Sequence, residues 1–165
     1  MDRRPSTGFG TTEAHTGALT REEVDALLRE PLIADLATIT DDGYPHIVEI
    51  WTEWDGTSIW LLCRAKAAFV AHLRARPKVG LLVARRDAAQ TRVLILGEAT
   101  VTEGSASLDE NPHLREVALR MALRYSGEAG ARYIDASASW PRCLVRITPD
   151  RMIGWGDVDW HPRYR

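Results

Sequence analysis

The sequence predicts a mainly β protein with short helices, folded as an antiparallel barrel whose ends the helices cover. Two tight turns, Asp41-Asp42-Gly43 and Asp55-Gly56, separate three short runs of strand-forming residues. Because such turns reverse the chain within a few residues, these runs predict an antiparallel meander and exclude a doubly wound parallel sheet for this half. Later runs bring the tally to about six or seven strands with two or three helices, which is typical of a closed or partly closed barrel.

The composition limits the possible functions. The chain has 165 residues, which suits one domain, and its 21 Lys and Arg against 23 Asp and Glu give a net charge of −2. This balance argues against a nucleic-acid-binding protein, which normally has a strong basic excess. Neither the two cysteines nor the five histidines have the spacing of a metal site. No run has the length of a membrane-spanning helix and no signal peptide is recognised, so we expect a cytoplasmic protein.

The N-terminal part divides into an arm and the start of the folded domain. Residues 1–18 are rich in Gly, Thr and Ser and poor in large apolar side chains. We therefore expect a flexible arm there and one barrel domain over residues 19–165. Thr20 and Glu23 have the spacing of a capping box, which predicts a helix that begins at this point and ends at Pro31.

The remaining elements follow from apolar spacing and from turn residues. Helices are predicted where apolar residues recur at helical spacing, over 66–76 and 111–125. Strands are predicted over 33–40, 44–54, 58–63, 79–84, 92–101, 143–147 and 152–155, with a turn at Pro149-Asp150 between the last two. Gly97 lies inside one of these strands, which indicates a bulge or a close approach of another backbone.

One segment carries a candidate binding site. Cys63-Arg64-Ala65-Lys66 joins the end of a predicted strand to the start of a helix. Free N–H groups and the positive end of the helix dipole favour an anion there, and Arg64 and Lys66 add two cations. The neighbouring strands hold three of the six tryptophans, whose indoles suit the wall of a flat ring. Solvated cations, ordinary barrel packing and an inert core thiol at Cys63 are the alternative interpretation.

Several motifs occur in a characteristic order: Leu36–Ile39, Asp42–Val48, Ile50-Trp51, Asp55-Gly56, His72–Leu81 and Arg92–Ala99. Together they resemble the flavin-binding split barrel family, the pyridoxamine 5′-phosphate oxidase-like group with its flavin/deazaflavin oxidoreductase branch. The resemblance covers about residues 20–104, and the tail from Trp155 is similar to that of some members. It implies a homodimer of six-stranded split barrels, with FMN or coenzyme F420 bound in two sites at the subunit interface.

The resemblance and the strand-to-helix segment together select the expected cofactor-binding residues. The ring is expected beside the strand from His46 to Trp51, the phosphate near Arg64 and Lys66, and two tryptophans of the tail as lids. The full set is His46, Val48, Ile50, Trp51, Leu62, Cys63, Arg64, Lys66, Trp155 and Trp160.

Three departures separate this chain from typical members. Many members have a Ser-Arg-Lys triplet at the helix start, where this chain has Ala67-Ala68-Phe69. Glu49 stands where a proline is frequent. True pyridoxamine 5′-phosphate oxidases also have a C-terminal segment with further arginines, and we do not find it. The resemblance therefore does not imply that enzyme.

The expected activity is hydride transfer between the cofactor ring and a small organic substrate. No side chain needs to act as a nucleophile, and the catalytic residue is not assigned. Candidates for a proton donor at the rim are Tyr44, Tyr133, His161 and Arg163. The alternative is a non-catalytic barrel that binds a flavin or a haem, for which His46, His72 or His161 are the candidate axial ligands. A dimeric interaction protein with an empty cleft is a third hypothesis.

Overall fold

The computed structural model describes residues 19–86 and 91–156, which form one antiparallel sheet and three helices. The helices are α1 (Arg21–Leu28), α2 (Ala68–Ala75) and α3 (Pro112–Ala136). The seven strands are β1 (Ala34–Ile39), β2 (Pro45–Ile50), β3 (Glu53–Trp54), β4 (Ile59–Arg64), β5 (Lys78–Ala84), β6 (Arg92–Ala106) and β7 (Arg142–Trp155). The predicted arm over 1–18, together with Trp160, His161 and Arg163, lies outside the described residues.

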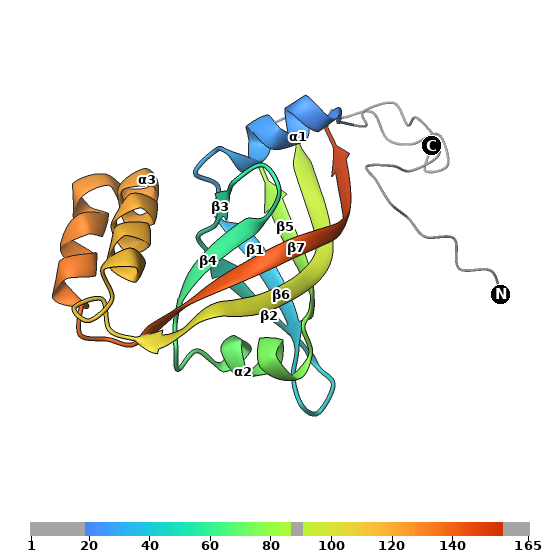
Figure 1. Ribbon diagram of the computed structural model, residues 1–165. Coiled ribbons are helices and arrows are strands. Elements are labelled where there is room, and N and C mark those ends of the chain that lie inside the picture. The colour runs from blue at the N-terminus through green and yellow to red at the C-terminus, as the bar shows by residue number, and fades with distance from the viewer. Residues whose placement is uncertain (1–18, 87–90, 157–165) are drawn as a thin grey trace, which may run out of the picture.

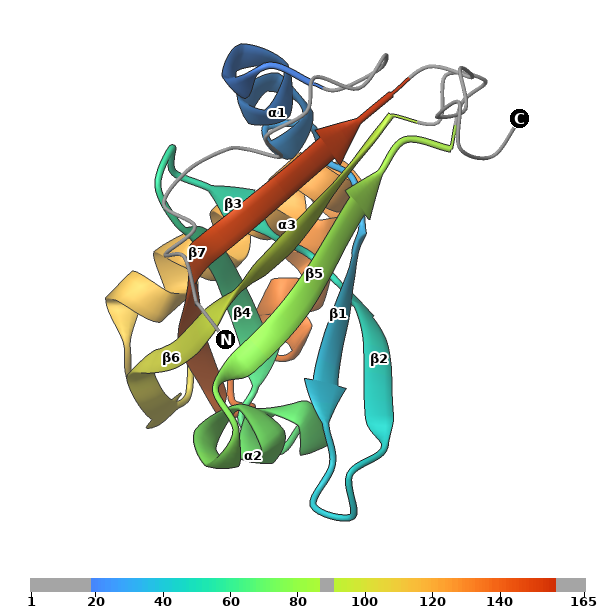
Figure 2. The same ribbon diagram turned by 90° about the vertical axis from the view of Figure 1, so that its right-hand side faces the viewer.

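The sheet curls into a barrel with an open seam. Its strand order is β2-β1-β5-β6-β7-β4-β3, and every neighbouring pair is antiparallel. The two edge strands, β2 and β3, follow each other in the chain with only Trp51 and Thr52 between them. This short link brings the two edges of the sheet together, and Figure 2 shows the resulting curvature.

The predicted meander is wrong in one respect, because the run over 44–54 is not one continuous strand, although both predicted turns join antiparallel pairs. The sheet has seven strands, one more than the resemblance implies and within the six or seven counted from the sequence. The run over 44–54 is divided at Trp51 and Thr52 into β2, which pairs with β1, and β3, which pairs with β4. The division has a physical reason. The backbone N–H of Thr52 donates to the Tyr125 hydroxyl at 3.1 Å instead of to a neighbouring strand. A side chain from α3 thus takes the place of a neighbouring strand as the hydrogen-bond partner of Thr52.

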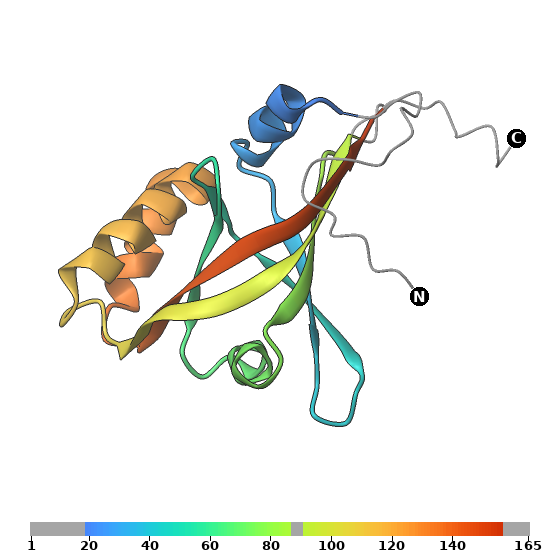
Figure 3. The same cartoon turned by 45° about the vertical axis from the view of Figure 1, so that its right-hand side comes forward.

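The helices cover the barrel from three directions. In Figures 1 and 3, α1 and α2 lie at opposite ends of the barrel and α3 stands beside it. Buried side chains from the inner face of the sheet pack against α1 and α2, and a second buried cluster lies beneath α3. The expectation that helices close the barrel ends is confirmed for α1 and α2. The capping box at Thr20 and Glu23 is also present.

Helix α3 is a hairpin of two helical halves and is longer than predicted. Asn111 caps its N-terminus, as its side chain accepts from the Leu114 N–H at 3.1 Å. The break is Gly127, whose φ of 56° and ψ of −142° are not helical. The prediction ended at residue 125 because only the first half has a regular apolar face. Neither α3 nor any other described helix is long and apolar enough to span a membrane.

Strands β6 and β7 are longer than their sequence patterns indicated. The turn predicted at Pro149-Asp150 is wrong, because β7 continues through both residues. The pairing shifts register between Leu96 and Gly97, where Gly97 faces Pro149. A Cβ atom on Gly97 would lie 2.3 Å from the Thr148 carbonyl oxygen. The predicted close approach at Gly97 is thus confirmed, and the bulge accommodates the proline inside a continuous strand.

Candidate functional site

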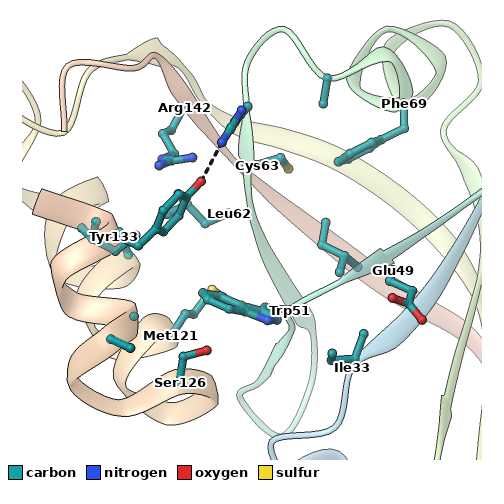
Figure 4. Close-up of a pocket in the computed structure, with 17 residues that line it drawn as sticks. Ile33, Glu49, Trp51, Leu62, Cys63, Phe69, Met121, Ser126, Tyr133 and Arg142 are labelled. Carbon is teal, nitrogen blue, oxygen red and sulfur yellow. Dashed lines mark hydrogen bonds between the residues drawn. The ribbon is translucent and has the colours of Figure 1, made fainter. Parts of the chain in front are cut away.

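A cavity of about 730 Å³ lies between the α3 hairpin and the barrel. Its walls come from the ends of β2 and β4, the start of α2 and both halves of α3 (Figure 4). The lining residues are Ile33, Glu49, Ile50, Trp51, Leu62, Cys63, Arg64, Ala67, Phe69, Ala118, Met121, Ser126, Ala129, Gly130, Tyr133, Ile134 and Arg142. Most of these side chains are apolar, and the volume lies within the range of about 300–1,000 Å³ typical of small-molecule sites.

Trp51 provides a flat, fixed wall of the cavity. Its indole stacks on the Tyr125 ring with 5.3 Å between centroids and 9° between planes. The Tyr125 hydroxyl lies 2.9 Å from the Leu32 carbonyl oxygen and 3.0 Å from the Thr52 carbonyl oxygen. Because this hydroxyl also accepts the Thr52 N–H, the ring under the indole is held from several directions. A second flat ring can stack on the exposed face of an indole positioned in this way.

Two arginines and a tyrosine form a polar end of the cavity. Arg64 and Arg142 occupy directly paired positions on β4 and β7. The Arg64 guanidinium donates to the Tyr133 hydroxyl at 2.9 Å, and Arg142 donates to the Ser137 Oγ at 2.6 Å. Figure 4 shows Tyr133 and Arg142 close together, with Phe69 on the other side of the cavity. Polar donors are thus concentrated at one end of an apolar site.

The two guanidiniums also change the acidity of Tyr133. Partial burial acts to raise the pKa of the phenol, but hydrogen bonds and positive charge from Arg64 and Arg142 outweigh it. The result is a pKa below the ordinary value of 10.0. Tyr133 was one of the proton-donor candidates from the sequence, and of the two candidates that the structure describes, Tyr44 and Tyr133, it is the one that lines the cavity. Tyr44 is 70% exposed on the turn between β1 and β2.

Half of the predicted cofactor-binding residues meet in this cavity. Ile50 reaches it from the end of β2, Trp51 from the link that follows, and Leu62, Cys63 and Arg64 from β4. This follows from the geometry of the open seam, where the ends of both strands face α3. The sequence analysis therefore assigned these two segments to one site correctly, although it predicted residues 44–54 as one continuous strand.

The other predicted residues lie elsewhere. Val48 packs against the barrel core, and the His46 ring lies edge-on to His72 with 5.1 Å between centroids. Lys66 is exposed, because α2 begins only at Ala68, and Trp155 stacks with Arg92 at 4.7 Å. None of the four residues His46, Val48, Lys66 and Trp155 is among the described residues that line the cavity. Trp160 lies outside the described residues.

Sequence reasoning named only Tyr133 from α3 and missed the contribution of β7. Arg142, Met121 and Ile134 were not expected in the site, although Met121 was predicted on a buried helix face. Arg142 directly precedes a predicted strand, but no local pattern indicates that this strand pairs with β4. Only the register between these strands places Arg142 beside Arg64.

The remaining titratable groups at the site do not suggest nucleophilic or metal chemistry. A hydrogen bond with Cys143 and burial both raise the pKa of the Cys63 thiol well above its usual value. A protonated, buried thiol is a poor nucleophile, which agrees with the interpretation of Cys63 as an inert core residue. In the described part of the chain, no cluster of His, Cys, Asp and Glu could hold a metal ion.

The chemistry of the lining fits a flat ring that bears an anionic group. The indole of Trp51 and the aliphatic side chains suit the ring, and Arg64 and Arg142 suit an oxyanion. The helix start at Ala67, Ala68 and Phe69 adds no cation of its own, in contrast to the Ser-Arg-Lys triplet of many split barrels. A haem held by histidine does not fit this cavity, because its described lining contains no histidine.

Comparisons with solved structures agree with this architecture. The structure of Rv2991, a conserved hypothetical protein from Mycobacterium tuberculosis, has 26% identity, a TM-score of 0.69, and coverage of 88% of this chain and 90% of its own. An F420 reductase has 23% identity and a TM-score of 0.60, covering 78% of this chain and 94% of its own. HutZ, the heme storage protein from Vibrio cholerae, has 19% identity and a TM-score of 0.61, covering 82% and 95%.

The family assignment rests on the sequence match. No curated protein matches this chain. The pyridoxamine 5′-phosphate oxidase family matches it over residues 20–156, a span that includes every described helix and strand. The resemblance seen in the motif order is therefore confirmed: this protein belongs to the pyridoxamine 5′-phosphate oxidase-like group of flavin- and F420-binding split barrels.

Proposed function

We propose that this protein is a flavin- or deazaflavin-dependent oxidoreductase that transfers a hydride between its cofactor ring and a small organic substrate. The observation that carries the proposal is the cavity, which combines a flat indole wall at Trp51 with cations at Arg64 and Arg142. The similarity in fold to an F420 reductase supports it. FMN and coenzyme F420 both remain candidates, because both join a flat ring to an anionic tail.

The residues of the chain itself bind and orient the cofactor and exclude water from it. Trp51 and Ile50 position the flat face of the ring, and the α3 hairpin shields it through Met121 and Ile134, which are buried. A flavin or deazaflavin, when bound, supplies the hydride chemistry itself. The Tyr133 hydroxyl accepts a hydrogen bond from Arg64, so its own proton is free to be donated into the cavity.

We further propose that the protein acts as a homodimer. The strand register places Ile47, Ala37, Gly80 and Leu96 in one row across β2, β1, β5 and β6. Ile47 is 65% exposed and Leu96 is 39% exposed, so an apolar row lies on the outer face of the sheet. A second copy of the chain is a suitable cover for such a row. His46, Val48, Lys66, Trp155 and Trp160, which were predicted from the sequence and are not among the described residues that line the cavity of one chain, stay candidates that depend on such a dimer.

The second candidate is a non-catalytic protein that binds a flavin or a haem. The specific observation that favours it is the pair of His46 and His72, whose rings are in contact away from the cavity. The His46 Nδ1 atom is buried without a partner among the described residues. The fold similarity to the heme storage protein HutZ is compatible with this alternative.

Side-by-side titration with FMN, F420 and haemin tests the proposal. We expect FMN or F420 to quench tryptophan fluorescence in a saturable way, because Trp51 lies in the cavity wall. Trp51→Phe should lose most of the quench. Trp60→Phe is the matched control and should keep it, because the Trp60 indole is bound to Asp55 at 2.7 Å and is not a lining residue. Binding of haemin alone, with no response to FMN or F420, would contradict the proposal.

A second measurement separates an enzyme from a binding protein. The bound cofactor is reduced with dithionite, the excess is removed, and a benzoquinone is added as a two-electron acceptor. An oxidoreductase should reoxidise its cofactor faster than the same cofactor free in solution, with one hydroquinone formed per cofactor. Reoxidation that is equal to or slower than that of the free cofactor would favour the non-catalytic alternative.

A further inference from the structure

Arg64 and Arg142 form a pair of like charges at facing positions. Their backbones are directly paired between β4 and β7, one position beyond the pair formed by Cys63 and Cys143. Facing residues of an antiparallel pair have neighbouring side chains on the same side of the sheet, and like charges at such positions repel each other. An arrangement of this kind is stabilised by a compensating anion.

No compensating anion is present among the described residues. The partners of the two guanidiniums are neutral: the Tyr133 hydroxyl and the Trp140 ring for Arg64, and the Ser137 hydroxyl and the Tyr133 ring for Arg142. No carboxylate of the described chain pairs with either arginine. Other arginines in the same structure do have such partners, for example Arg120 with Glu53.

The burial of Arg142 sharpens this contrast. Its side chain is only 4% exposed, and its Nε atom is buried without a hydrogen-bond partner in the described part of the chain. Removing a guanidinium from water is unfavourable unless its donors are satisfied and its charge is balanced. Because Arg142 and Arg64 both line the cavity, an anion can reach them from there.

We propose that Arg64, Arg142 and Tyr133 form an oxyanion subsite, which binds the carboxylate or phosphate of a ligand whose apolar body occupies the rest of the cavity. Guanidinium groups bind such oxyanions with parallel N–H donors, and the phenol adds a third donor. The direction of the pKa shift of Tyr133 agrees with this assignment, because the same two guanidiniums lower that pKa against the opposing effect of burial. The subsite rests on the proposed function only for the identity of the apolar body.

The subsite is tested first without a cofactor. Benzoate and inorganic phosphate, added at constant ionic strength with chloride as reference, should raise the melting temperature of the unmodified protein. Arg142→Gln should weaken the apparent affinity for benzoate at least tenfold. Arg146→Gln is the matched control, an exposed arginine on the same strand outside the cavity, and should leave it unchanged.

The melting temperature without ligand is a second measurement. If Arg142 served only to stabilise the fold, Arg142→Gln would lower this temperature. Since Arg142 is an unbalanced buried charge, ligand-free Arg142→Gln should be at least as stable as the unmodified protein. If Arg142→Gln does not fold, the exposed Arg64→Gln takes its place in the same binding assay. The subsite would be overturned if neither benzoate nor phosphate raised the melting temperature of the unmodified protein and if FMN bound with equal affinity to all variants.

A comparison of FMN with riboflavin, which lacks the phosphate, identifies the source of the oxyanion. Loss of FMN affinity in Arg142→Gln with riboflavin unchanged assigns the subsite to the cofactor phosphate. FMN affinity that stays unchanged while benzoate binding is lost assigns it to an acidic substrate. If neither FMN nor F420 binds but benzoate binding still depends on Arg142, the proposed function fails and the subsite stands.

Discussion

The two halves of the α3 hairpin meet the barrel in different ways. The first half is held by matched charges and carbonyls. Arg120 forms an ion pair with Glu53 at 2.8 Å, and Arg124 donates to the carbonyl oxygens of Leu28, Glu30 and Thr52. Positive charge on this half is thus satisfied within the fold.

The second half borders two arginines whose charges the described chain does not balance. Tyr133 and Ile134 face the cavity, where the partners of Arg64 and Arg142 among the described residues are all neutral. Comparison of the halves separates the charges that are paired within the fold from the two to which we assign a ligand. Binding and catalytic sites commonly retain groups that are unfavourable for stability alone.

The largest effect is expected from breaking the anchor of the first half. Arg124→Ala removes donors from three carbonyl oxygens on the α1–β1 connection and on the β2–β3 link. Because hydrogen bonds to charged groups contribute about 1.5–3 kcal/mol and are not additive, we expect a loss of about 3 kcal/mol in the free energy of unfolding. Urea denaturation measures it. Arg132→Ala, an exposed arginine of the second half, is the control and should change little.

A smaller effect is expected at the junction of the two halves. Gly127 has a φ of 56°, which side chains other than glycine rarely adopt, so Gly127→Ala should cost about 1–2 kcal/mol of unfolding free energy. Gly104→Ala is the matched control, because Gly104 has ordinary φ and a methyl group added there would have no atom within 4 Å. An equal effect of both substitutions would show that the junction is not strained by a side chain.

The smallest effect is expected in the pH dependence of stability and comes from Asp55, in the turn that follows β3. Burial acts to raise the pKa of Asp55, but hydrogen bonds from Trp60, Ser58 and Thr57 prevail and lower it to about 2. Since the folded pKa lies below the ordinary value of 3.8, the carboxylate stabilises the fold above about pH 4. This contribution is lost as the pH falls through 2.

Asp55 is exposed, so solvent screening limits the contribution to about 1 kcal/mol or less. Asp55→Asn should therefore lower the unfolding free energy at pH 7 and flatten its decline between pH 4 and pH 2. Denaturant titrations at several pH values measure this. The control is Asp42→Asn, another turn aspartate, and a parallel decline in both variants would contradict the assigned role of Asp55.

Much of the fold could be predicted from local sequence patterns. The capping box at Thr20 and Glu23, the strand over 79–84 and the close approach at Gly97 each depend on residues within a few positions of one another. Propensity and turn chemistry act at that range, so the sequence records them. The division of the 44–54 run was not readable, since its cause is Tyr125, which comes from a distant helix.

The candidate site was readable only in part, for the same reason. Ile50, Trp51 and Leu62–Arg64 were found because strand ends and a helix start carry local signals. His46 and Val48 were expected at the ring as well, but only the C-terminal end of β2 reaches the cavity. The second half of α3 was not predicted as a helix, because its apolar spacing is weak, and Tyr133 was the one residue of this half that the sequence analysis named.

Local chemistry thus determines that this chain forms short antiparallel strands and capped helices, and that Arg64 lies at a strand end near a helix. Tertiary structure alone decides that β4 pairs with β7 and that α3 folds back over the open seam. Pairing between distant strands depends on closing long loops and burying shared apolar surface, which no short stretch of sequence encodes. The arginine pair and its cavity are products of that step.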